Sequence, residues 1–228
     1  MKQITLFLSL LFCFYGVNAQ TNLSGTYGYS LKPGINANNS GIDAVGASGT
    51  LVLQRMEGNK YRFWLDINIG APSYNMGETD GTLVFVNDTA SHDNTFEGGN
   101  PCILHFKITG TTITITSNGS SSDCGFGNNV SANGTYKKLK NQPAINNAWL
   151  KKEYPEASTI RITADKTEIF QDESLQHSFN PKQYLSKGET MLAIAPTENM
   201  IYTEYFTPAG KFMCGWIKKT DAKVVKTE

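Results

Sequence analysis

Few residues in this chain have the type and spacing that catalysis requires. Ser48 lies in a Gly-Ala-Ser-Gly stretch, which lacks the spacing of a nucleophile elbow and precedes no predicted helix. The three histidines have no partner at metal-ligand spacing, and we expect His92 and His177 in loops and His105 on the outward row of a strand. We therefore predict a protein that is not an enzyme, with no catalytic residue, no metal site and no cofactor.

Two weaker patterns concern binding. Gly125-Phe126-Gly127 is too short for a phosphate-binding loop and precedes no helix. The carboxylates of Glu78 and Asp80, and the group of His92, Asp93 and Glu97, indicate either a solvated loop or a weak calcium site.

Two of the cysteines are candidates for a structural disulfide. Cys102 and Cys124 lie 22 positions apart in one predicted β unit, and we expect them to form a disulfide in an oxidising compartment. Such a bridge restricts the unfolded chain by roughly 3 kcal/mol in the loop-entropy model. Cys214 lies in an apolar strand, where it is either a buried thiol or a reactive cysteine.

Trp64 is the more informative candidate for binding. The alternating run 61–69 places Tyr61 and Phe63 on the inward face of a strand, so the side chain of Trp64 must point outward. Two alternatives follow. Either Trp64 is covered by the second half of the chain or by Trp149, or it forms a contact surface for an external partner.

The second half contains further aromatic candidates. Tyr184, Tyr202, Tyr205 and Trp216 are candidates for a shallow peptide-binding groove, although Trp216 also fits a core position. Tyr202 and Tyr205 are three positions apart and therefore point to opposite faces of a strand.

The elements that carry these residues are mostly strands. Residues 23–138 read as about eight short antiparallel strands, separated by turns at 57–59, 80–81 and 109–111 and by loops at 91–101 and 117–129. Ser24-Gly-Thr-Tyr27 and Asn133-Gly-Thr-Tyr136 are alike, and side-by-side pairing of these end strands would close the sheet. We predict an all-β protein whose residues 20–139 form a small antiparallel barrel with a lipocalin-like outline and an aromatic interior.

The rest of the chain divides into a linker and a second β domain. In the linker, 140–158, Pro143 fits the first turn of a short helix that Pro155 ends. Residues 159–228 form the second domain, with strands expected at 160–162, 167–170, 200–206 and 211–217. A loop is expected at 171–181, and 184–194 is expected to be a turn that feeds a further strand.

Both β segments resemble known families. The Lys-Gly turn at Tyr184, Leu185, Lys187, Gly188 and Glu189 and the closing Gly215, Trp216, Ile217, Lys218 and Asp221 resemble the bacterial SH3-like domain. The first segment resembles a family of uncharacterised exported bacterial barrel domains, through Cys102, Leu104, Phe106, Cys124, Gly125, Gly134, Tyr136 and Lys138. The first resemblance implies an SH3-like barrel, and the second implies export and fold but no activity.

The start of the chain has the pattern of an export signal. Lys2 is followed by an apolar run from Ile4 to Val17, and small residues precede a cleavage site after Ala19, so we expect residues 1–19 to be removed. The bulky phenylalanines beside Cys13 argue against a lipid anchor. We expect a bacterial protein that is periplasmic or secreted, without a membrane span.

Charge and composition narrow the possible functions. Cleavage removes one basic residue, Lys2, from 20 basic and 20 acidic residues, which leaves a net charge of 19 − 20 = −1. A net charge this close to zero produces no electrostatic field that would attract nucleic acid or an anionic membrane. The leading hypothesis is a binding protein whose SH3-like domain recognises a protein or peptidoglycan peptide in the cell envelope, with the barrel as a second surface. The alternatives are a small-ligand carrier and an inhibitor of a lysozyme-type hydrolase that uses the loop 117–129.

Overall fold

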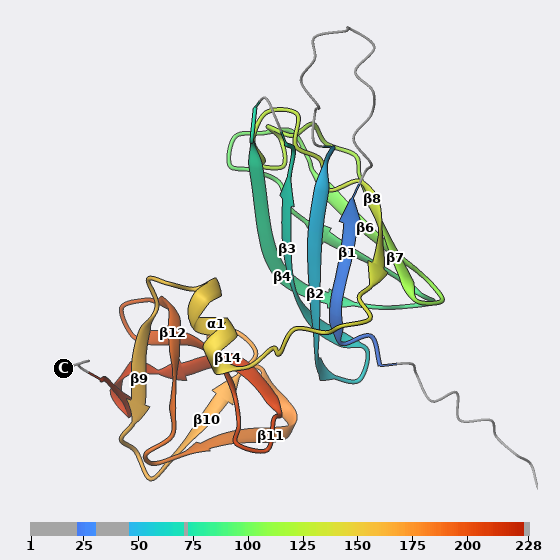
Figure 1. Cartoon of the computed structure of the whole chain (residues 1–228). Coiled ribbons are helices and arrows are strands. Elements are labelled where there is room, and N and C mark those ends of the chain that lie inside the picture. The colour runs from blue at the N-terminus through green and yellow to red at the C-terminus, as the bar shows by residue number, and fades with distance from the viewer. Residues whose placement is uncertain (1–21, 31–45, 71–72, 226–228) are drawn as a thin grey trace, which may run out of the picture.

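The structure is a computed structural model that describes residues 22–30, 46–70 and 73–225. The predicted export signal at 1–19, with Cys13 and the cleavage site at Ala19, lies outside these residues. Two antiparallel sheets follow each other along the chain, with a short helix between them (Figure 1). Each sheet has its own hydrophobic cluster, and the strand content confirms the prediction of an all-β protein.

The first sheet is an eight-stranded, nearly closed barrel with the order β4-β3-β2-β1-β8-β7-β6-β5. Its first and last strands pair, with Tyr27 opposite Lys138 and Gly28 opposite Lys137, as their similar sequences predict. The strands are Gly25–Ser30 (β1), Ser48–Glu57 (β2), Lys60–Asn68 (β3), Met76–Val84 (β4), Thr89–Asp93 (β5), Ile103–Thr109 (β6), Thr112–Ser117 (β7) and Gly134–Lys138 (β8).

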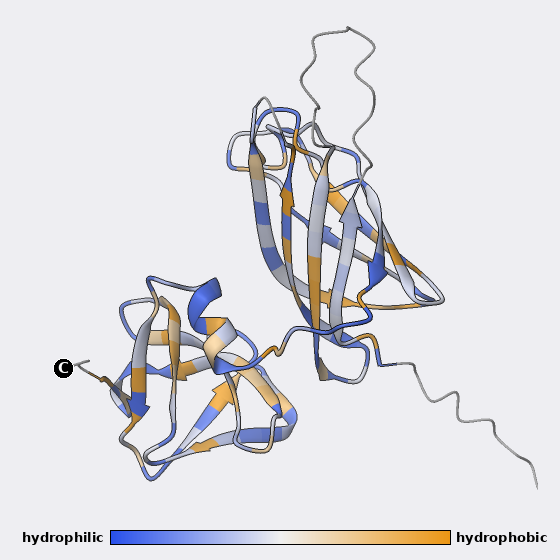
Figure 2. Ribbon diagram, viewed as in Figure 1, coloured by the Kyte–Doolittle hydropathy of each residue, from blue (hydrophilic) through white to orange (hydrophobic). Residues whose placement is uncertain are grey.

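Aromatic side chains fill the barrel interior. The rings of Phe63 and Phe106 meet edge to face with centroids 5.3 Å apart, and the Tyr27 hydroxyl donates a hydrogen bond of 2.7 Å to the carbonyl oxygen of Leu23. Hydrophobic positions recur along the strands of both sheets (Figure 2). An interior filled in this way favours a packed barrel over a small-ligand carrier. The five largest of these side chains are Tyr27, Tyr61, Tyr136, Phe63 and Phe106, each at most 2% exposed.

Two predictions for the barrel were wrong, and both concern strands that lack apolar alternation. The expected turn at 80–81 lies in the middle of β4, and His92, expected in a loop, belongs to β5. The inward positions of β4 include Gly77 and Gly81 because other side chains occupy that space. A Cβ at Gly77 would lie 2.7 Å from Phe126, and one at Gly81 would lie 2.4 Å from His92.

The helix α1 is Asn147–Glu153 and starts later than the sequence suggested. Asn146 caps it, since its side-chain oxygen accepts hydrogen bonds of 3.0 Å from the backbone nitrogens of Ala148 and Trp149. Pro143 therefore precedes the helix instead of opening it. Within the described residues, no helix combines the length and apolar character needed to cross a membrane.

The second sheet has seven strands in the order β11-β10-β14-β13-β12-β9-β15. The predicted loop 171–181 is too long, because β11 already begins at Ser178. The expected turn that feeds the strand ending at 194 is present at Gly188, where φ is 90°, although β11 extends to Ser186 before it. The strands are Ser158–Ile162 (β9), Lys166–Phe170 (β10), Ser178–Ser186 (β11), Thr190–Pro196 (β12), Met200–Phe206 (β13), Phe212–Lys218 (β14) and Ala222–Val224 (β15), with a 3₁₀ turn, η1, at Lys219–Asp221.

Candidate functional site

Three of the five predicted binding residues lie where the two sheets meet. Tyr202 on β13 and Trp216 on β14 are paired across the strands, with ring centroids 5.5 Å apart. The guanidinium carbon of Arg62, on β3 of the barrel, lies 6.0 Å from the centroid of the Tyr202 ring and 5.3 Å from that of Trp64. The face of the second sheet that carries Tyr202 is therefore turned toward the barrel.

Trp64 is covered by the chain itself. Its side chain is 2% exposed, and its ring meets the rings of Trp149 on α1 and Phe212 on β14 edge to face, with centroids 5.0 and 5.9 Å apart. The indole nitrogen donates a hydrogen bond of 2.6 Å to the hydroxyl of Tyr154. The prediction of Trp64 as a partner-binding residue is thus corrected: it faces outward from the barrel, but the helix and the second sheet cover it.

An apolar cluster surrounds Trp64, and we call it the domain contact. It joins barrel strands β2 and β3 to α1 and to β12, β13 and β14 of the second sheet. Cys214 belongs to it as a buried free thiol, and burial raises the pKa of this thiol to about 12. This agrees with the buried-thiol alternative. The buried members are Val52, Trp64, Leu150, Ala157, Leu192, Phe206, Phe212 and Cys214.

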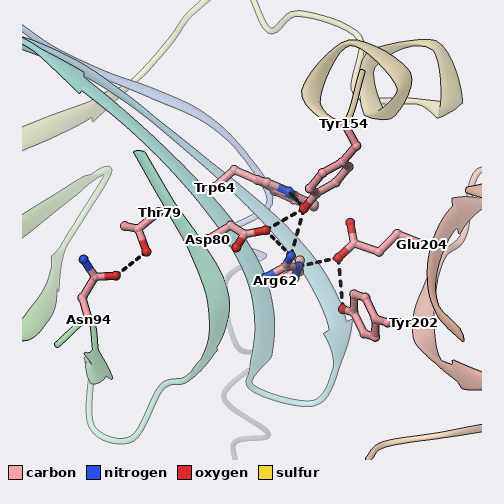
Figure 3. Close-up of polar contacts among 8 residues, drawn as sticks. All are labelled: Arg62, Trp64, Thr79, Asp80, Asn94, Tyr154, Tyr202 and Glu204. Atoms are coloured by element: carbon pink, nitrogen blue, oxygen red, sulfur yellow. Dashed lines mark hydrogen bonds and ion pairs between the residues drawn. The ribbon is translucent and has the colours of Figure 1, made fainter. Parts of the chain in front are cut away.

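Arg62 is the polar centre of the domain contact (Figure 3). Its Nε donates a hydrogen bond of 2.5 Å to Oε1 of Glu204 on β13, and its Nη2 donates to Asp80 on β4. Nη2 also donates to the hydroxyl of Tyr154, at 2.9 Å, and the Tyr202 hydroxyl donates to the same Glu204 oxygen at 3.0 Å. One guanidinium thereby connects the barrel, the end of the helix and the second sheet.

Burial makes this ion pair sensitive to the loss of either partner. Burial raises the pKa of Glu204, while Arg62 acts in the opposite direction. Burial alone would lower the pKa of Arg62, but Glu204 and its other neighbours raise it above its ordinary value. The second carboxylate oxygen of Glu204 is buried and has no hydrogen-bond partner among the described residues. Without Arg62, the Glu204 carboxylate would be an uncompensated buried charge.

An apolar groove of about 490 Å³ opens beside the domain contact, and we call it the side groove. Its apolar lining comes from Ile160, Ala193, Ile194 and Ile201, on three neighbouring strands of the second sheet. Its charged lining has both signs. Glu153 and Glu156 come from the end of α1 and the loop after it, and Lys219 comes from η1.

A smaller acidic cleft of about 250 Å³ shares Glu153 and Tyr154 with the side groove. It is also lined by Asp66, Glu78 and Asp80 of the barrel. Burial and these neighbouring carboxylates raise the pKa of Glu153 to about 7. A cationic group next to the side groove would relieve this crowding of negative charge. Among the described residues, no group of three or more His, Cys, Asp and Glu is arranged to hold a metal ion.

The remaining predicted residues do not join the others. Tyr184 is 40% exposed on the edge strand β11, where the Lys166 ammonium lies 3.7 Å from its ring centroid. Tyr205 is buried in the core of the second sheet and points away from Tyr202, as their spacing predicts. The five candidates therefore do not form one groove. Cys102 and Cys124 are bonded, as predicted.

Sequence reasoning missed the residues that line the side groove and those that centre the domain contact. Arg62 and Glu204 both sit at outward positions of strands that look solvent-facing in the sequence, and they are 142 positions apart. The sequence contained one signal: each residue shares its strand face with an aromatic residue two positions away, Trp64 for Arg62 and Tyr202 for Glu204. Comparison of the chain with protein-family models, with curated proteins and with solved structures found no significant match.

Proposed function

We propose that this is an exported, non-catalytic binding protein whose second sheet is an SH3-like domain and binds an extended peptide in the side groove. Strand order supports the SH3-like assignment, since β12, β13 and β14 form an antiparallel meander and η1 leads into a short β15 that pairs with β9. The aromatic face around Tyr202 is occupied by the barrel, so the ligand binds beside it.

One observation carries the proposal: the side groove is apolar along its strands and carries both signs of charge. Lys219 is exposed, and its Nζ donates a hydrogen bond of 3.1 Å to the carbonyl oxygen of Thr197 at the turn between β12 and β13. The free carboxylate of a peptide would pair with the ammonium group of Lys219. An amine on the same peptide would pair with the carboxylates of the acidic cleft beyond Glu153. The stem peptides of peptidoglycan combine small apolar residues with both charges.

The experiment is a calorimetric titration of the full chain with purified peptidoglycan stem peptides. The substitution Lys219→Glu should weaken binding about tenfold, or ~1.4 kcal/mol, because it places a carboxylate beside the ligand carboxylate. The matched control is Lys211→Glu, because Lys211 is an exposed lysine in the turn between β13 and β14 and does not line the side groove. Failure of the stem peptides to bind, or equal binding by both variants, would disprove the proposal.

A further inference from the structure

The helix α1 and the turn after it lie at the boundary between the two sheets (Figure 1), and we call residues 147–157 the strap. Both ends of the strap are fixed to the second sheet. The side chain of Asn147 donates a hydrogen bond of 2.8 Å to the carbonyl oxygen of Phe206 on β13 and accepts one of 2.7 Å from the Phe206 backbone nitrogen. At the other end, β9 begins at Ser158. Whether the middle of the strap lies on the barrel therefore depends on its own contacts there.

The middle of the strap contacts the barrel through Trp149 and Tyr154 (Figure 3). The Trp149 ring meets the Trp64 ring edge to face. The Tyr154 hydroxyl donates a hydrogen bond of 2.7 Å to Oδ2 of Asp80, and it accepts hydrogen bonds from the Trp64 indole and the Arg62 guanidinium. One phenol hydroxyl thus connects the end of α1 to two strands of the barrel.

Negative charge opposes these contacts. Glu153, the residue before Tyr154, lines the acidic cleft together with Asp66, Glu78 and Asp80 of the barrel. Among the described residues that line this cleft, none is a lysine or an arginine. Carboxylates from two separate parts of the molecule therefore face each other at the point where the strap lies on the barrel, and like charges at such a site disfavour ionisation.

The other charged and titratable groups around Glu153 have partners or are neutral. Arg62 is paired with Asp80 and with Glu204 of β13. Lys219 of η1, which lies on the side-groove side, donates to the carbonyl oxygen of Thr197. Burial raises the pKa values of two phenols and keeps them neutral, and the exposed charged residues of the strap lie outside the acidic cleft. The phenols are Tyr154 and Tyr202, and the exposed residues are Lys151, Lys152 and Glu156.

We propose that the strap is a pH-dependent latch, which holds onto the barrel while Glu153 carries a proton and releases Trp64 and Asp80 when Glu153 is ionised. Ionisation puts a fourth carboxylate into a cleft that has no cation among its described lining residues. A helix of seven residues is not stable without tertiary contacts, so release unfolds its last turn. Residues 153–157 also form one wall of the side groove, so release changes the shape of that groove.

The latch operates near neutral pH. Burial and the neighbouring carboxylates raise the pKa of Glu153 from 4.5 to about 7 in the closed strap. Burial and Glu78 raise the pKa of Asp66 as well, which shows that the cleft disfavours negative charge on the barrel side too. The closed strap binds the proton more tightly than the open strap, so it is favoured below pH 7 and this advantage is lost as pH rises through 7.

The test is amide hydrogen exchange of the full chain, followed by NMR at pH 6 and pH 8. The backbone nitrogen of Tyr154 donates a hydrogen bond of 2.9 Å to the carbonyl oxygen of Leu150, so its exchange reports release. Its protection factor, corrected for the intrinsic exchange rate, should fall about tenfold from pH 6 to pH 8, as expected for a carboxyl whose pKa is about 7 when closed and 4.5 when open. At both pH values it should be lower than the protection factors of β3 amides, because release is local.

Three variants separate the latch from a general effect of pH. Glu153→Gln removes the titrating group and should give the Tyr154 amide nearly equal protection at both pH values. Asp66→Asn removes a facing carboxylate and should make the change smaller than tenfold. The matched control is Glu156→Gln, which removes an exposed carboxylate of the strap that does not line the acidic cleft, and it should keep the full change.

Three results would overturn the proposal. The first is equal protection of the Tyr154 amide at pH 6 and pH 8 in the unmodified chain, and the second is a tenfold change that persists in Glu153→Gln. The third is protection of the strap as high as that of β3, since this would show unfolding of the whole chain instead of release of the strap. The test uses no ligand, so its outcome does not depend on whether the side groove binds peptides.

Discussion

At the scale of single residues, Arg62 connects the two halves of the molecule. It is 6% exposed and donates hydrogen bonds to Glu204 of the second sheet, to Asp80 and to Tyr154. A buried ion pair contributes little net stability compared with apolar packing, but it penalises every arrangement in which one partner is missing. The pair Arg62–Glu204 therefore fixes how the second sheet is placed against the barrel.

The substitution Arg62→Met tests this role. It should lower the free energy of unfolding by ~3–5 kcal/mol, because Glu204 is left buried without a counter-charge. The control Arg161→Met removes an exposed arginine of β9 and should change stability by less than ~0.5 kcal/mol. Adding Glu204→Leu to Arg62→Met should restore much of the loss in urea unfolding. A near-neutral single variant would contradict this role of Arg62.

Glu153 predicts a dependence of stability on pH. The pKa of this carboxyl in the folded protein is raised to about 7, so the folded state binds more protons than the unfolded state between roughly pH 4.5 and 7. Stability should consequently fall as pH rises through this range. The substitution Glu153→Gln should raise the thermal midpoint at pH 8 and leave it nearly unchanged at pH 4. Equal effects at both pH values would show that this carboxyl is not perturbed.

At the scale of elements, the sequence predicted strands well wherever apolar residues alternate. The run 61–69 became β3 with Tyr61, Phe63 and Leu65 in the barrel core. The prediction from apolar alternation failed for β4, because its inward row includes Gly77 and Gly81 in place of large side chains. The rings that fill this space, Phe126 and His92, come from loops and strands distant in sequence, so no local pattern reports them. The side groove was unpredictable for the same reason, since its lining comes from six separate elements.

The packing of Phe126 over β4 leads to a prediction. Gly77→Ala should cost ~1–3 kcal/mol, because the new Cβ would lie 2.7 Å from the Phe126 ring in a filled interior. Glu78→Ala is the matched control, since residue 78 is adjacent but exposed, and it should cost less than ~0.5 kcal/mol. Chemical unfolding of both variants gives the comparison, and equal costs would argue against a packed barrel end.

The disulfide of the barrel leads to a prediction about stability. Reduction of Cys102–Cys124 should destabilise the protein by ~2–4 kcal/mol, since the bridge closes a segment with a sequence separation of 22. The double variant Cys102→Ser and Cys124→Ser should lose the same stability and no longer respond to reductant. Cys214→Ala should keep the full response, because that thiol is unbonded. A response to reductant that persists in the double variant would point to a different bridge.

At the scale of the whole molecule, we expect the two sheets to act as one body. Two domains joined by a linker usually move relative to each other unless their contact is extensive and apolar. Here the contact combines the cluster around Trp64 with the ion pair of Arg62 and Glu204, and it uses the aromatic face that would otherwise be open for ligands. A fixed arrangement holds the side groove in one position relative to the barrel.

Residual dipolar couplings of backbone amides, measured on the full chain in one weakly aligning medium, report whether the two sheets keep one orientation. We expect a single alignment tensor to fit the amides of both sheets together, with the orientation seen in the structure. Two tensors of clearly different magnitude or direction, one for the barrel and one for the second sheet, would contradict it.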